Sequence, residues 1–173
     1  MEWTAAVITV SDKGSRGERV DTSGPALVEM LKAAGYEVVY TKIIPDEFDQ
    51  IAQELRHCSD ELKVCLALTT GGTGFSPRDI TPEATLSVIE RETRGIPEAM
   101  RAFSMTITDK ACLSREAAGI RGETLIVNLP GSRKASTENL SAVLKPIHHG
   151  IEILRGETAN CGEEHHHHHH HHE

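Results

Sequence analysis

The sequence predicts an α/β fold, a three-layer sandwich in which a mostly parallel central sheet lies between layers of helices. Short apolar runs rich in β-branched residues alternate along the chain with segments of helical periodicity. The connections between them are short, as in folds built from strand–helix–strand units. Two of the runs, 64–68 and 125–127, are apolar throughout, which is typical of strands covered by helices on both faces.

Each element follows from its local pattern. Strands are expected where apolar and β-branched residues cluster, at 5–10, 38–44, 64–68 and 125–127. Helices are expected to start at Thr22-Ser23-Gly24-Pro25, at Pro45-Asp46 and at Thr81-Pro82, and also within 95–113 and from about Ser136 to Leu154. No internal repeat or linker interrupts this order, so the 173-residue chain is predicted to hold one domain, 1–162, followed by a tag region, 163–173, with a run of histidines.

Charge and hydropathy exclude two classes of partner. The chain has 18 basic and 26 acidic residues, a net charge of −8, which argues against nucleic-acid binding as its main function. No apolar run approaches the roughly 18 residues that a membrane span requires, and the expected compartment is the cytoplasm. A phosphorylated small molecule remains a suitable ligand, because the backbone amides of a loop can bind it without a basic surface.

Three polar loops should meet at one edge of the sheet. In a parallel sheet the ligand crevice lies outside the carboxyl ends of the strands, where the loops 11–17, 70–79 and 128–132 are expected. The loop Gly71-Gly72-Thr73-Gly74 is the most informative, because residues without Cβ let several backbone N–H groups approach an anion. Its spacing matches neither a P-loop nor a dinucleotide-binding fingerprint. A tight turn that binds nothing is the alternative.

Two aspartates could serve this crevice. Asp79 precedes a helix whose start is already explained by Thr81-Pro82, so its carboxylate is expected to be free rather than a helix cap. A carboxylate beside a phosphate-binding loop is unfavourable unless a cation lies between them, which predicts Mg²⁺ with a nucleotide. Asp46, after Pro45, is either the cap of the next helix or a second carboxylate that faces the metal or the substrate.

The motifs together resemble one family over nearly the whole chain before the tag. The blocks are Ser11-Asp12-Lys13-Gly14-Ser15, Asp21-Thr22-Ser23-Gly24-Pro25, Thr69-Thr70-Gly71-Gly72-Thr73-Gly74 with Pro77-Arg78-Asp79-Ile80-Thr81-Pro82-Glu83, Leu113-Ser114-Arg115, Gly119-Ile120-Arg121-Gly122 and Asn128-Leu129-Pro130-Gly131. In this order they resemble the MogA/MoaB family of molybdenum-cofactor biosynthesis. The resemblance implies a mostly parallel sheet between helices, a homotrimer, and molybdopterin binding.

The resemblance also implies a reaction and its residues. ATP and molybdopterin would give adenylyl-molybdopterin and pyrophosphate, with Mg²⁺ as cofactor. The family's two functional aspartates correspond to Asp46 and Asp79, which are predicted to be catalytic and to hold the metal. The residues expected to bind the nucleotide, the pterin or their phosphates are Ser11, Gly71, Gly72, Thr73, Gly74, Ser114, Asn128, Pro130, Gly131 and Ser132.

Three functions remain open from the sequence. The first is the adenylyltransferase, with hand-over of its product to a molybdenum-insertion protein. The second is a non-catalytic molybdopterin-binding protein of the MoaB type, and the third is a trimeric scaffold. The apolar stretch with Met100, Phe103 and Met105 is either plain core or part of a subunit contact.

Overall fold

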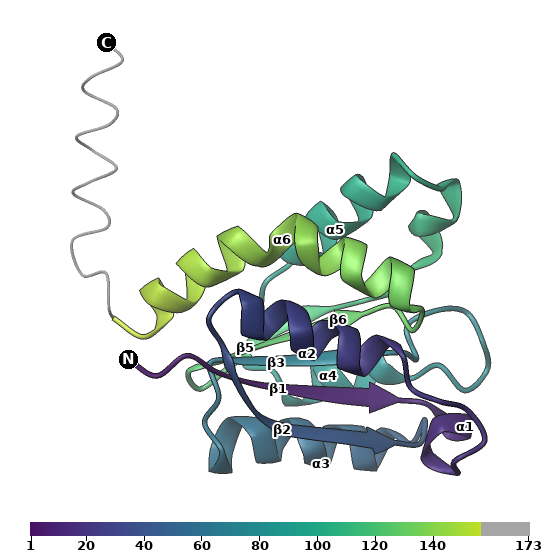
Figure 1. The fold of residues 1–173 in the computed structure, drawn as a ribbon, viewed down its shortest axis with the longest axis horizontal. Helices are drawn as coiled ribbons and strands as arrows, with labels where there is room; N and C mark the ends of the chain where they lie inside the picture. The colour runs from purple at the N-terminus through teal and green to yellow at the C-terminus, as the bar shows by residue number, and fades with distance from the viewer. Residues whose placement is uncertain (157–173) are drawn as a thin grey trace.

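The computed structural model describes residues 1–156 and shows a six-stranded sheet with helices on both faces (Figure 1). The strand order is β2-β1-β3-β6-β5-β4, which confirms the predicted three-layer α/β sandwich. The predicted tag region, 163–173, and the last residues of the predicted domain lie outside the described residues.

As expected, helices separate most of the strands along the chain. The strands are β1 (Thr4–Val10), β2 (Glu37–Ile44), β3 (Leu66–Thr70), β4 (Arg91–Glu92), β5 (Ala118–Arg121) and β6 (Thr124–Leu129). The α-helices are α1 (Asp12–Ser15), α2 (Ser23–Ala33), α3 (Phe48–Arg56), α4 (Thr81–Val88), α5 (Gly95–Met105) and α6 (Arg133–Leu154). A π-helical turn, η1 (His57–Glu61), follows α3, and a 3-10 helix, η2 (Asp109–Leu113), follows α5. Within residues 1–156, no helix is both long and apolar enough to cross a membrane.

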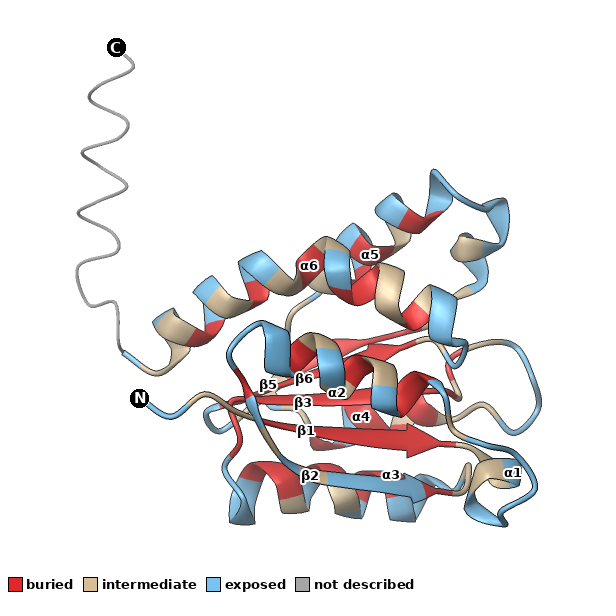
Figure 2. Cartoon of the chain, viewed as in Figure 1, coloured by how far each residue is buried: buried red, intermediate tan, exposed pale blue. Residues whose placement is uncertain are grey.

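Side chains that alternate along the central strands form two separate cores. Val7 and Leu68 belong to the core covered by α2, α5 and α6, whereas Ile8 and Ile126 belong to the core covered by α3 and α4. The strands β1, β3 and β6 are buried along almost their whole length, while β2 forms an exposed edge (Figure 2). Runs that are apolar at every position are therefore explained by burial on both faces.

Strand direction determines where the loops meet. The strands β2, β1, β3 and β6 are parallel, so the loops that follow β1, β3 and β6 emerge at the same edge of the sheet. Two short strands that the sequence pattern did not indicate complete the other side: β5 is antiparallel to β6, and β4 is antiparallel to β5. The sheet is therefore mostly parallel with an antiparallel edge.

Several helices differ from the prediction: α1 lies within the expected loop 11–17, and α3 begins at Phe48 rather than at Pro45-Asp46. The helix α6 begins at Arg133 rather than near Ser136, because the hydroxyl of Ser132 accepts a hydrogen bond from the Ala135 amide (3.1 Å) and caps the helix there. The helical pattern expected within 95–113 is divided into α5 and η2. Residues 106–108 separate the two, and Ile107 and Thr108 line a cavity beside the sheet edge.

Candidate active site

Two adjoining cavities lie at the carboxyl edge of the sheet. The first, of about 680 Å³, is formed mainly by the loops after β1, β2 and β3. The second, of about 610 Å³, lies between the loop after β3, the α5–η2 segment and the start of α6. Four residues line both cavities: Gly72, Asp79, Gly131 and Ser132. Both volumes are suited to small molecules, and the shared wall would bring two bound ligands close together.

The structure distributes the predicted site residues between these cavities. Besides the four shared residues, the first cavity contains Ser11, Asp46 and Gly71. The second contains Thr73, Gly74, Ser114 and Pro130. Ser11 and Ser114, both expected to bind the nucleotide, the pterin or their phosphates, therefore lie in different cavities. Ser11 also caps α1, where its hydroxyl accepts a hydrogen bond from the Gly14 amide (2.9 Å).

Asn128, unlike the other predicted ligand-binding residues, lines neither cavity. The residue is fully buried. Its Oδ1 accepts a hydrogen bond from the Ala117 amide (3.1 Å), and its Nδ2 donates to the hydroxyls of Thr69 (3.0 Å) and Thr85 (2.8 Å). These partners belong to β3, to α4 and to the chain that precedes β5. The residue predicted to bind substrate instead joins β6 to three neighbouring segments.

The glycine loop offers fewer amides than the sequence predicts. The amide of Gly71 donates to the carbonyl of Leu129 (3.1 Å), and that of Gly74 donates to Asp79 Oδ2 (3.0 Å). The predicted phosphate cradle is thus reduced to the amides of Gly72 and Thr73. Gly72 has a φ of +69°, and a Cβ at this position would collide with the hydroxyl of Thr81 and approach Asp46 Oδ1. Only glycine allows the loop to pass so close to the carboxylate.

Asp46 is a partly buried carboxylate rather than a helix cap. The helix α3 begins at Phe48 and has no side-chain cap. Asp46 Oδ2 instead accepts the Asp12 amide (3.0 Å), and the Asp46 amide donates to Asp12 Oδ1 (3.0 Å). Burial raises the pKa of Asp46, and the negative charges of Asp12 and Asp79 raise it further. A cation bound here would relieve this repulsion.

Asp79 is used by its own loop more than the sequence predicts. As expected, it is not a helix cap, since α4 begins at Thr81 without a side-chain cap. Its carboxylate, however, is not entirely free: Oδ2 accepts the amides of Gly74 and Ser76, both at 3.0 Å. These bonds fold residues 74–79 into a closed turn. Both bonds end on Oδ2, so Oδ1 is the atom that could contact a ligand or a metal.

Arg78 forms an ion pair with Asp12, an acidic residue close to Asp46 and Asp79. Its guanidinium donates to both carboxylate oxygens of Asp12 (3.0 and 3.1 Å) and to Glu47 (2.9 Å). These bonds hold the pKa of Asp12 below its usual value. Within residues 1–156, neither Asp46 nor Asp79 is in an ion pair. Asp46 and Asp79, like Asp21, are therefore carboxylates of the first cavity that have no ion-pair partner among the described residues.

The carboxylates of Asp46 and Asp79 suit a divalent cation whose remaining ligands come from the substrate and water. Residues 1–156 contain no group of three or more Asp, Glu, His or Cys side chains placed to hold a metal by themselves. Mg²⁺ is commonly held by one or two carboxylates together with substrate phosphates and water. Two nearby carboxylates beside a loop that presents free amides satisfy that requirement.

Sequence reasoning gave Arg115 no role, although it directly follows Ser114 in a motif of the resemblance. Its guanidinium donates to the carbonyls of Gly74 (2.8 Å) and Asp79 (3.0 Å) and to the carboxylate of Glu83 (2.7 Å). The Arg115 amide also donates to the Thr73 carbonyl (2.8 Å). Arg115 therefore clamps both ends of the loop that contains Asp79.

Asp21 was also missed, although it stands in the Asp-Thr-Ser-Gly block at the start of α2. Thr22 occupies the capping position of α2, but it makes no capping bond. Asp21 Oδ1 instead accepts the amide of Gly24 (3.0 Å), and Oδ2 accepts the hydroxyl of Thr9 (2.7 Å). Asp21 lines the first cavity. Its position three residues before Gly24 is the sequence signal that could have identified it.

The amino-acid sequence of the chain is similar to those of known proteins. Residues 6–149 match the family model described as a probable molybdopterin binding domain. The molybdopterin adenylyltransferase of Helicobacter pylori (strain 26695) is 39% identical over 160 residues, which are 91% of each chain. Gephyrin of Dictyostelium discoideum is 44% identical over 167 residues, which cover 90% of this chain.

Two further findings concern length and three-dimensional similarity. The chain spans 23% of gephyrin and 27% of the Drosophila melanogaster protein named molybdenum cofactor synthesis protein cinnamon, so it corresponds to about a quarter of these longer relatives. The crystal structure of MoaB from Thermus thermophilus superposes with a TM-score of 0.83 at 46% identity, covering 89% of this chain and 97% of that one. The chain therefore belongs to the MogA/MoaB family of molybdenum-cofactor biosynthesis proteins.

Proposed function

We propose that this protein is a molybdopterin adenylyltransferase, which transfers AMP from ATP to molybdopterin and releases pyrophosphate. The observation that carries the proposal is the pair of adjoining cavities whose common wall contains Gly72 and Asp79. Two substrates bound side by side could exchange a group across this wall. Relatives named molybdopterin adenylyltransferase, 39–44% identical over most of the chain, support the same activity.

The reaction needs positioning and charge neutralisation rather than a covalent enzyme intermediate. An oxygen of the terminal phosphate of molybdopterin attacks the α-phosphorus of ATP, forming a new P–O bond. The bond from that phosphorus to the β-phosphate oxygen breaks, and pyrophosphate leaves with the electron pair. The amides of Gly72 and Thr73, together with the Thr73 hydroxyl, are assigned to donate to the phosphate oxygens at the shared wall. The protein thereby aligns the reacting atoms.

The side chains favour one assignment of the substrates to the cavities. Lys13 and Arg19 line the first cavity along with Asp46, a combination suited to a polyphosphate and its metal. Ile107 and Leu113 contribute apolar walls to the second cavity, next to Ser114. We therefore place ATP in the first cavity and molybdopterin in the second. Ser11 then belongs to the nucleotide side, whereas Ser114 and Pro130 belong to the pterin side.

The residues that would hold Mg²⁺ are Asp46 and Asp79. When bound, the ion would neutralise phosphate charge as the pyrophosphate departs. Asp79 is placed by its bonds to the amides of Gly74 and Ser76, and Asp46 by its exchange of hydrogen bonds with Asp12. Each carboxylate is therefore oriented by the backbone before any ligand binds.

The proposal includes a homotrimer that acts in the cytoplasm without nucleic-acid or membrane partners and passes its product to a molybdenum-insertion protein. The apolar stretch at the end of α5 supports a subunit contact. Met100 is buried in the core, but Phe103 and Met105 are 39% and 47% exposed, and Ile107 and Leu113 follow at 46% each. Apolar side chains gathered on one surface commonly mark a protein contact.

The test is pyrophosphate release from ATP by the purified chain with molybdopterin and Mg²⁺. Asp79→Asn keeps an acceptor oxygen for the loop amides but removes the charge, so it should fold and bind molybdopterin yet release no pyrophosphate. Asp79→Ala should also lose turnover, with a less ordered loop. Turnover retained in Asp79→Asn would exclude the metal role. A wild-type chain that binds molybdopterin without turnover would instead be the non-catalytic MoaB-type protein.

A further inference from the structure

Glu116 is a buried carboxylate that the proposed reaction does not use. It lies between η2 and β5, is 3% exposed, and lines the second cavity. Neither of its carboxylate oxygens has a hydrogen-bond partner among the described residues. Burial raises its pKa to about 7, and the nearby Arg101 and Ser114 oppose part of this shift. Buried carboxylates in native proteins are normally paired, because an unpaired one is costly.

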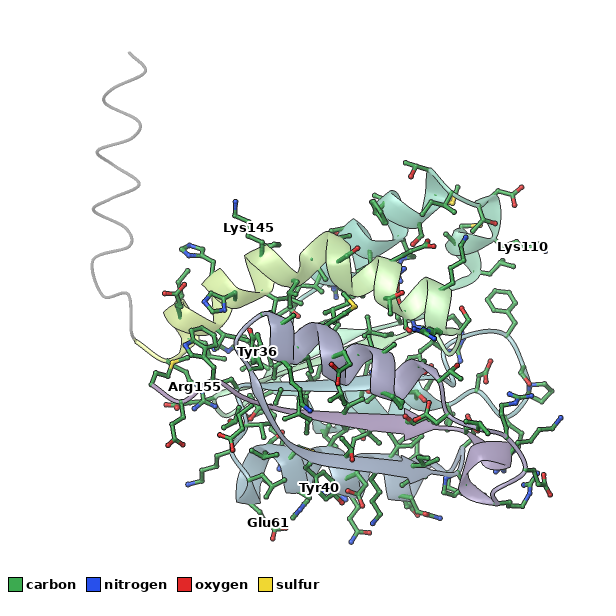
Figure 3. The ribbon with its side chains drawn as sticks, viewed as in Figure 1. Tyr36, Tyr40, Glu61, Lys110, Lys145 and Arg155 are labelled. Atoms are coloured by element: carbon green, nitrogen blue, oxygen red, sulfur yellow. The ribbon has the colours of Figure 1, made fainter. Side chains whose placement is uncertain are left out.

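Two of the cations that line the second cavity, Arg101 and Lys134, are engaged by groups other than the Glu116 carboxylate. Arg101 Nη1 donates to the backbone carbonyls of Ser114 (3.3 Å) and Glu116 (3.2 Å), not to the Glu116 carboxylate. Lys134 pairs with Glu138 at 3.3 Å. Lys110, on η2, also lines this cavity and extends outward above the carboxyl edge of the sheet (Figure 3). Arg101 and Lys134 therefore do not supply the donors that the Glu116 carboxylate lacks, and a molecule that enters the cavity could supply them.

The Glu116 carboxylate favours a ligand that has two neighbouring N–H groups on one side of a ring. Its two oxygens can accept two parallel N–H groups, the geometry in which carboxylates pair with guanidinium groups. The aminopyrimidinone ring of a pterin has an edge with two such donors. A ring N–H and an exocyclic amine are both bonded to the same carbon, C2. Donation from this edge would stabilise the charged form of Glu116.

We propose that Glu116 is the specificity-determining residue of the second cavity and accepts the ring N–H and the 2-amino group of the pterin. The inference rests on the proposed function, because it assigns molybdopterin to this cavity. It sets the orientation of the substrate: the aminopyrimidinone ring lies toward Glu116, and the phosphate lies toward Gly72 and Asp79 at the shared wall.

The experiment compares two ring compounds that differ only at this edge. Pterin has an amine at C2, whereas lumazine has a carbonyl there, and the binding of each to the full chain can be followed by its fluorescence. The wild-type chain should bind pterin about 10- to 100-fold more tightly, the effect expected of hydrogen bonds to a charged group. Glu116→Gln, which offers one acceptor and one donor, should abolish or reverse this preference.

The control is Glu138→Gln, the same change in a carboxylate of the same cavity that already has Lys134 as its partner. It should keep the preference of the wild-type chain. Equal binding of the two compounds by wild type, no binding of pterin at millimolar concentration, or an unchanged preference in Glu116→Gln would each overturn the proposal. Pyrophosphate release by the wild-type chain, measured separately, shows whether the failure lies in the Glu116 assignment or in the proposed function.

Discussion

At the scale of single residues, the site depends on groups that orient other groups. Asp79 can face the shared wall only if its loop keeps its shape, and that shape is held by Arg115. The guanidinium contacts carbonyls at both ends of the turn, those of Gly74 and Asp79, and is itself anchored by Glu83. A planar group with several fixed donors can hold such a set of acceptors, whereas the single ammonium of lysine cannot.

Arg115→Lys should therefore lower kcat by about 10- to 100-fold, since small displacements of catalytic groups have effects of this size. KM for ATP should change much less. A matched control is Arg121→Lys on β5, because Arg121 likewise joins a carboxylate, Asp60, to a carbonyl, that of Val88. It should lose similar stability in thermal unfolding but keep its kcat. Equal loss of kcat in both variants would show that Arg115 acts only on stability.

At the scale of secondary-structure elements, buried polar contacts determine how the strands and helices join. Thr81, the first residue of α4, donates its hydroxyl to the Gly71 carbonyl (3.0 Å) and so connects the helix to the glycine loop. Asn128 connects β6 to β3, to α4 and to the chain before β5 through one hydrogen bond each. Buried groups of this kind are expensive to leave unpaired, so they specify one arrangement of the elements.

Asn128→Ala should destabilise the protein by about 2–4 kcal/mol, because it leaves the Ala117 amide and two threonine hydroxyls without this partner and creates a cavity. Urea unfolding measures this change. The kcat/KM per folded molecule should stay near the wild-type value, since the side chain reaches neither cavity. Unchanged stability together with a large loss of molybdopterin affinity would restore the ligand-binding role predicted from the sequence.

At the scale of the whole molecule, the position of exposed apolar side chains indicates where subunits of the proposed trimer could contact one another. Phe103 and Met105 lie at the exposed end of α5, on the side of the sheet that also carries α2 and α6 (Figure 1). Leu86 is exposed to a similar extent, 45%, but belongs to α4, which covers the opposite face. Phe103 and Leu86 can therefore each be replaced by aspartate to introduce the same charge on opposite faces of the molecule.

If the α5 surface is the subunit contact of the proposed trimer, Phe103→Asp should reduce the mass measured by light scattering to that of one chain. Circular dichroism should remain that of a folded α/β protein. Leu86→Asp should keep the wild-type mass. A wild-type chain that is already monomeric would contradict the proposed trimer, and dissociation of both variants would place the contact elsewhere.

The sequence by itself determined the order and type of the main elements and the loops that carry the chemistry. Periodicity depends on neighbours a few residues apart, which is why β1, β3, β6 and their helices could be predicted. The glycine loop and the two aspartates were recognisable because each consists of particular residue types in a short segment. Their meeting at one edge followed from the parallel direction of the strands.

Only the tertiary structure decided which atoms in these loops are available to a ligand. Asn128 is fully committed to groups up to 59 positions away, and Arg115 reaches a carbonyl 41 positions away. Two amides of the glycine loop are already used by Leu129 and Asp79. The second cavity and the unpaired carboxylate of Glu116 arise where α5, η2 and α6 pack beside the sheet. Hydrogen bonding and burial depend on residues that are far apart in the sequence and that the fold brings together. A local sequence pattern does not contain this information.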